Sequence, residues 1–213
     1  MKKASFLRIA GWATILAALV GLVVSLFETI AFQALSGNPA LTVFAYSLEV
    51  CAALGYIGLL VVQRGIVARI GVGIILAIAV ASAVWSALLV SLLQRQAITI
   101  VSIGEASLLI SAVDTVGFML VGIPTIQRRL LGRWSFAPLA IGAWIPAAYL
   151  LRLWLEGYGP GFVQFFYSHG VQGALLENLI LGLPQVFFAV ALGLGLLDAS
   201  RTVSPQPTFA AAV

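Results

Sequence analysis

Residues 9–34 read IAGWATILAALVGLVVSLFETIAFQA, and this stretch decides the fold of the chain. It holds one charged residue, Glu28, and it exceeds the roughly 20 apolar residues that a helix needs to cross a bilayer. Lys2, Lys3 and Arg8 precede it, as in a secretory signal peptide. Because the apolar core of a signal peptide is only about 7–15 residues long, we expect a retained transmembrane helix here.

Apolar stretches of similar length recur along the rest of the chain, at 41–63, 67–93, 97–125, 135–155 and 173–198. Of the 213 residues, 62% are hydrophobic and 8% are charged, whereas about 25% of the residues in a soluble domain are charged. This composition excludes a soluble enzyme and a nucleic-acid-binding domain. It predicts an all-α polytopic membrane protein in which residues 1–198 form a single bundle of six transmembrane helices, joined antiparallel by short connections.

The basic residues predict the orientation of this bundle. With the N-terminus inside, only Arg95 and Arg152 of the 11 lysines and arginines fall near the outer ends. The others lie at the inner ends: Lys2, Lys3, Arg8, Arg64, Arg69, Arg128, Arg129, Arg133 and Arg201. The positive-inside rule therefore predicts that both termini are cytoplasmic. We expect the bundle to lie in the plasma membrane. Residues 199–213, rich in Pro, Ser and Ala, are expected to form a disordered cytoplasmic tail.

Four glutamates lie in four different predicted helices, at Glu28, Glu49, Glu105 and Glu177. A rise of about 1.5 Å per residue puts all four roughly 6–12 Å below the outer helix ends. Since an acid facing hydrocarbon costs about 2.5–3.5 kcal/mol on insertion scales, the pattern favours an acidic pocket that opens outward. Its further candidate lining residues are Arg152, Asn178, Gln185 and Tyr56. Alternatively, each glutamate is satisfied separately, by a serine, a backbone carbonyl, an arginine or water.

A second polar position lies deeper in the fourth predicted helix, at Asp114 with Ser111 on the same face. Glu105 precedes Asp114 by nine residues, and at about 100° per residue the two carboxylates point to opposite sides of the helix. We therefore expect Asp114 and Ser111 to form a polar site apart from the outer pocket.

The fifth connection contains GYGPGFVQFFYSHGVQ at residues 157–172. The spacing of Phe162, Phe165, Phe166 and His169 is that of one helix face. This pattern predicts a short helix in the outer membrane interface, where it either anchors the bundle or covers the pocket as a lid.

Small residues recur every three or four positions in three of the predicted helices. The first carries Ala13, Ala17, Gly21, Ser25 and Thr29, the third carries Gly73, Ala77 and Ala81, and the sixth carries Asn178, Gly182, Gln185, Ala189 and Gly193. Small side chains let membrane helices approach closely. These ridges are expected to pack within the chain or, alternatively, to bind a partner subunit.

The sequence offers little else for chemistry. It has one histidine, His169, and one cysteine, Cys51. These counts exclude a bis-histidine haem and a three-histidine zinc site within one chain, as well as an intrachain disulfide. We expect no cofactor and no nucleic-acid partner. Carboxylates can also bind Ca²⁺, Mg²⁺ or Mn²⁺, so the question of a metal stays open.

These observations favour an integral membrane transport or ligand-binding protein for a cation, a proton or a basic small molecule. An accessory subunit of a membrane complex and a carboxylate-dependent membrane enzyme are the alternatives. In size, predicted helix number and outward pocket the chain resembles the substrate-binding subunits of energy-coupling-factor vitamin transporters. Those subunits dock through an Ala-xxx-Ala motif on the first helix, and Ala13 and Ala17 have that form. The resemblance implies a bound small ligand and a partner subunit.

Overall fold

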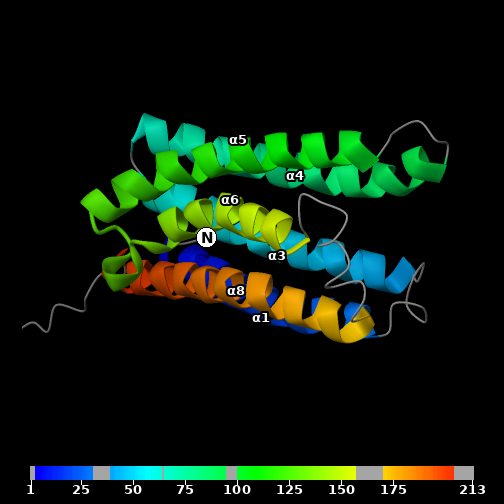
Figure 1. The fold of residues 1–213 in the computed structure, drawn as a ribbon. Coiled ribbons are helices and arrows are strands. Elements are labelled where there is room, and N and C mark those ends of the chain that lie inside the picture. Colours follow the sequence, from blue (N-terminus) through cyan, green and yellow to red (C-terminus); the bar gives the residue numbers. More distant parts are fainter. Residues whose placement is uncertain (1–2, 31–38, 64, 95–99, 157–169, 204–213) are drawn as a thin grey trace, which may run out of the picture.

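The structure is a computed structural model that describes residues 3–30, 39–63, 65–94, 100–156 and 170–203. All regular structure in these ranges is helical (Figure 1). The elements are α1 (Lys3–Ile30), α3 (Pro39–Val62), α4 (Ile66–Gln94), α5 (Ile100–Gln127), the 3-10 turn η1 (Gly132–Trp134), α6 (Ala137–Glu156) and α8 (Gly170–Val203). The predicted all-α class is therefore confirmed for the described part of the chain.

The helices run along a common axis and stack in pairs (Figure 1). α1 and α8 lie side by side along one edge, α4 and α5 along the other, and α3 and α6 lie between these pairs. Contacts link α1 to α3, α5 to α6 and α6 to α8, while the most extensive contact joins α1 to α8. The bundle thus brings its first and last described helices together.

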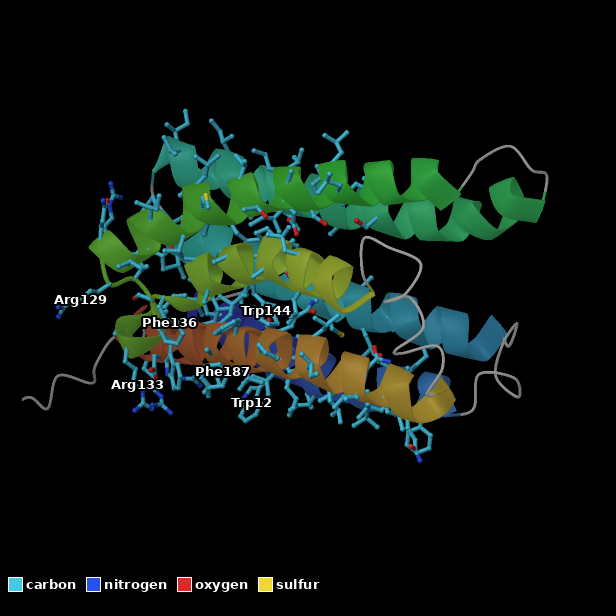
Figure 2. The ribbon with its side chains drawn as sticks, viewed as in Figure 1. Trp12, Arg129, Arg133, Phe136, Trp144 and Phe187 are labelled. Atoms are coloured by element: carbon cyan, nitrogen blue, oxygen red, sulfur yellow. The ribbon has the colours of Figure 1, made fainter. Side chains whose placement is uncertain are left out.

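Three helices contain segments that are long and apolar enough to cross a membrane: Lys3–Phe27, Leu108–Gln127 and Asn178–Thr202. Shorter apolar segments occur at Val50–Val62 and Ile66–Ser82. Large apolar side chains cover the outside of the bundle, and Figure 2 shows Trp12 and Phe187 on the outer faces of α1 and α8. Water-soluble proteins rarely expose so much apolar surface. These features therefore indicate integration into a membrane.

The packed core occupies one half of the bundle, the half that contains the start of α1 and the end of α8 (Figure 1). Its fully buried members include Leu7, Leu59, Val72, Phe118, Val121, Leu131, Leu192 and Leu196. In the other half, none of residues 18–27 of α1 or 178–190 of α8 is buried. One half of the molecule is therefore close-packed, whereas these stretches of α1 and α8 stay partly accessible.

Glycines allow the closest helix crossings in the packed half. A Cβ built on Gly11 of α1 would lie 2.8 Å from the carbonyl oxygen of Gly193 of α8, and one on Gly193 would lie 2.7 Å from that of Gly11. Gly71 of α4 and Gly117 of α5 face each other in the same way. Such close backbone approach is the usual basis of helix association in membranes, where burial of apolar surface gives little drive.

The predicted small-residue ridge of α4 faces away from the other described helices. Gly73, Ala77 and Ala81 are exposed, and a Cβ on Gly73 would have no neighbour within 4 Å. α4 instead packs through Gly71, Val72 and Ile75. The expectation that this ridge packs within the chain is therefore wrong, because the same spacing of small residues also occurs on a face that the bundle leaves exposed.

The last helix is longer than predicted. It continues to Val203, so the first five residues of the expected tail are helical. Ala199 and Ser200 are buried, and Arg201 reaches back to Asp198 at 3.5 Å between nitrogen and oxygen. These contacts extend the helix through a segment whose composition alone favours disorder. Residues 204–213 lie outside the described residues.

Candidate functional site

A cavity of about 410 Å³ lies between α1, α3, α6 and α8, and it extends outward from the core members Ile141 and Leu192. Its walls are mainly apolar or small side chains. The lining residues are Thr14, Ala17, Ala18, Gly21, Leu22 and Ser25 of α1; Leu48, Ala52 and Tyr56 of α3; Ile141 of α6; and Asn178, Leu181, Gly182, Gln185, Val186, Ala189 and Leu192 of α8.

The small-residue ridges of α1 and α8 form this space. Near its inner end the two helices touch at Gly11 and Gly193, whereas further out the missing side-chain volume stays open. Gly21 illustrates this, because a Cβ built there would meet no atom within 4 Å. Ala17 also lines the cavity and is only 8% exposed, so it faces the interior and not an outer docking surface.

Three of the predicted pocket residues lie on the cavity wall: Tyr56, Asn178 and Gln185. The Tyr56 ring meets the Phe118 ring edge to face, with centroids 5.7 Å apart and planes at 77°. This contact fixes the phenol of α3 against the packed core. The cavity therefore offers neutral hydrogen-bonding groups on a largely apolar wall.

Two residues that sequence reasoning missed also shape the wall. The Thr14 hydroxyl donates to the Ala10 carbonyl oxygen at 2.8 Å, which turns its methyl group and oxygen toward α3. The Trp144 indole N–H donates to the Leu181 carbonyl oxygen at 3.1 Å and ties α6 to α8 beside the cavity (Figure 2). Only their placement between helices reveals these roles, since Thr and Trp are common in membrane helices.

Three predicted acids stand close in sequence to the cavity residues. Glu49 follows Leu48, Glu177 precedes Asn178, and Glu28 lies one helical turn beyond Ser25. Their backbones belong to α3, α8 and α1, while their side chains lie outside the described part of the structure. The helices therefore bring these three positions near the end of the cavity that lies away from Gly11 and Gly193.

Glu105 and Arg152 occupy other places in the bundle. Glu105 is in α5, and no described residue of α5 lines the cavity. Arg152 is in α6, eleven positions beyond Ile141, which is the cavity residue of that helix. Both side chains lie outside the described part. The predicted lid residues Phe162, Phe165, Phe166 and His169 fall in 157–169, which is also outside it.

Asp114 lies in α5, away from the cavity lining but close enough to Tyr56 for an electrostatic interaction. One of its carboxylate oxygens, Oδ1, is buried and has no hydrogen-bond partner among the described groups. The carbonyl oxygen of Ser111 accepts a hydrogen bond from the Thr115 hydroxyl at 2.7 Å. Among the described side chains, no three His, Cys, Asp or Glu residues are grouped so that they could share a metal ion.

Comparisons with protein-family models, curated proteins and solved structures found no match to this chain.

Proposed function

We propose that the chain is an integral membrane protein that binds or transports a small organic cation in the cavity between α1, α3, α6 and α8. The main support for the proposal is the cavity. Its volume of about 410 Å³ falls within the roughly 300–1,000 Å³ that small-molecule sites occupy. A proton or a bare ion needs far less room, so this volume favours a basic small molecule among the predicted ligands.

The chemistry of the wall supports an amphipathic ligand. Apolar and small residues make up most of it, and they suit the hydrocarbon part of an organic amine. Tyr56, Asn178 and Gln185 supply polar atoms that orient a bound molecule. In this proposal Glu49 and Glu177, which neighbour the lining residues Leu48 and Asn178 in the sequence, provide the negative charge that a cation needs.

The proposal includes a bundle of six transmembrane helices with both termini in the cytoplasm. The described helices are 20 to 34 residues long, and about 20 residues suffice to span a bilayer. Lys3, Arg8, Arg69, Arg128, Arg129, Arg133 and Arg201 all belong to the end of the bundle that holds the start of α1 and the end of α8. A basic end of this kind supports its assignment to the cytoplasmic side.

Binding of benzyltrimethylammonium to the detergent-purified protein tests the proposal, with the uncharged isostere neopentylbenzene as comparison. We expect the cation to bind at least tenfold more tightly, which corresponds to about 1.4 kcal/mol. Glu49→Gln should remove most of this preference for charge. Equal affinity for the cation and the uncharged compound would contradict a cation site.

Two glycine variants locate the bound molecule. Gly21→Val places its side chain in the cavity without meeting a backbone, and we expect it to weaken binding at least tenfold. Gly73→Val is the matched control, since a Cβ on Gly73 also meets nothing within 4 Å but points away from the bundle. Unchanged binding by Gly21→Val would place the ligand elsewhere.

A further inference from the structure

An ordered turn connects α5 to α6 at the basic end of the bundle. Its sequence is RRLLGRWSF, residues 128–136. Two backbone hydrogen bonds terminate α5, each 3.1 Å long. The Leu130 N–H donates to the Thr125 carbonyl oxygen, and the Arg129 N–H donates to the Ile126 carbonyl oxygen. This pairing is the Schellman motif, in which the residue after the helix adopts a left-handed backbone. Arg129 occupies that position, with a φ of 48°.

The rest of the connection is anchored to the core. The Ser135 hydroxyl accepts a hydrogen bond from the Leu131 N–H at 3.1 Å and donates one to the Gly132 carbonyl oxygen at 2.8 Å. Leu131 is fully buried, and a Cβ on Gly195 of α8 would lie 2.8 Å from its Cβ. The turn therefore holds its outward-facing residues in fixed positions.

Three exposed arginines stand on this anchored turn, Arg128, Arg129 and Arg133. The Arg133 guanidinium lies 4.9 Å from the centroid of the Trp134 ring, and exposed Phe136 follows (Figure 2). None of the three arginines has a carboxylate partner among the described side chains; the ion pair at this end joins Arg201 to Asp198. Uncompensated positive charge thus lies directly beside aromatic side chains.

The backbone of Arg129 points to a role beyond folding. Glycine takes a left-handed conformation without steric cost, and it is the usual residue at this position of the motif. The chain instead places a strained arginine there, directly after Arg128 and four residues before Arg133. A strained residue on an exposed, well-anchored turn is a reason to look for a ligand of that residue.

We propose that Arg128, Arg129 and Arg133 form a binding site for the headgroups of anionic phospholipids in the adjacent leaflet. The planar guanidinium group donates two parallel hydrogen bonds to phosphate oxygens. Trp134 and Phe136 belong at the depth where headgroups meet acyl chains. Clusters of arginine at the ends of membrane helices attract anionic lipids in this way. The site depends on the membrane placement of the bundle and is independent of the ligand in the cavity.

The test compares thermal unfolding of the full chain in neutral detergent with added dioleoylphosphatidylglycerol or dioleoylphosphatidylcholine. We expect the anionic lipid to raise the Tm of the wild type by several degrees and the zwitterionic lipid to have little effect. Arg129→Gly relieves the left-handed strain, so it should raise the Tm without lipid and yet lose at least half of the shift caused by the anionic lipid. If Arg129 had only a structural role, Arg129→Gly would change the Tm without lipid but would leave the shift caused by the anionic lipid unchanged.

Two further variants complete the test. Arg128→Gln combined with Arg133→Gln should remove the remaining shift, whereas Arg201→Gln, an exposed arginine at the same end, should keep it. A full anionic-lipid shift in Arg129→Gly and in the double variant would overturn the proposal. An equal shift with inorganic phosphate at the same concentration would also overturn it, since it would indicate a free-anion site.

Discussion

At the scale of single residues, the inner wall of the cavity depends on the close approach of Thr14 on α1 to Gly55 on α3. Thr14 is 4% exposed, and its hydroxyl is held by the Ala10 carbonyl oxygen. A Cβ built on Gly55 would lie 2.0 Å from the Thr14 Oγ1, a separation that no pair of side chains tolerates. The absence of a side chain at Gly55 therefore sets the spacing between these two helices.

Gly55→Ala should destabilise the protein by about 1–3 kcal/mol, the usual cost of overpacking a core. Adding Thr14→Ala should recover most of the loss, because the nearest remaining atom would be the residue-14 Cβ at 3.2 Å. Unfolding by denaturant in detergent measures both effects. Gly73→Ala, at an open helical position, should be neutral or stabilising by up to about 1 kcal/mol. An equal loss in Gly73→Ala would show that the cost is not the Thr14 contact.

Single residues also show which parts of the cavity could be predicted from the sequence and which could not. Polar residues within apolar helices singled out Tyr56, Asn178 and Gln185, which line the cavity, because such residues avoid lipid. The same reasoning passed over Thr14 and Trp144, whose hydrogen bonds to backbone carbonyls depend on helix placement. A left-handed arginine is likewise invisible in a sequence, since that conformation normally indicates glycine.

Among the helices, hydropathy predicted where each helix lies in the sequence better than it predicted which of its faces points into the bundle. The predicted runs 67–93 and 135–155 differ by one or two residues at each end from α4 (Ile66–Gln94) and α6 (Ala137–Glu156). Length and apolar composition are enough to place such helices. The inward face is harder, because lipid is as apolar as the core and both faces carry similar residues. The exposed ridge of α4 is the clearest case, and its use by a partner subunit stays a prediction.

The C-terminal end of α8 gives a prediction at this scale. Ala199 and Ser200 are buried against the bundle, and the Ser200 hydroxyl donates to the Leu197 carbonyl oxygen at 2.6 Å. A chain ending at Val203 should keep the stability of the full chain, whereas one ending at Asp198 should lose about 1–3 kcal/mol through exposed core. Thermal unfolding of the two truncated chains in detergent checks this. Equal stability of the two would show that residues 199–203 contribute nothing to the packing.

At the scale of the whole molecule, the bundle differs between its two halves. The half with the packed core also carries most of the described basic residues and the anchored turn at residues 128–136, while the cavity extends from the core into the other half. This division suits a protein that is fixed at one membrane face and receives a ligand from the opposite side.

This division predicts the result of reporter fusions. Green fluorescent protein joined after Val203 should fluoresce in bacterial cells, because it folds in the cytoplasm. Alkaline phosphatase at the same point should be inactive, and alkaline phosphatase joined after Glu156 should be active. The reverse pattern would place the basic end outside, and it would contradict the proposed orientation of the cavity as well.

The contact between α1 and α8 also has a consequence for how the protein is made. A ribosome makes α1 before α8, and the two glycines of the Gly11–Gly193 crossing are separated in the chain by the helices between them. Until α8 enters the membrane, α1 has only α3 among its main neighbours, and one wall of the cavity is missing. The walls of the cavity are therefore complete only after α8 has joined the bundle, so the proposed site would form after α1, α3 and α6 are already in place.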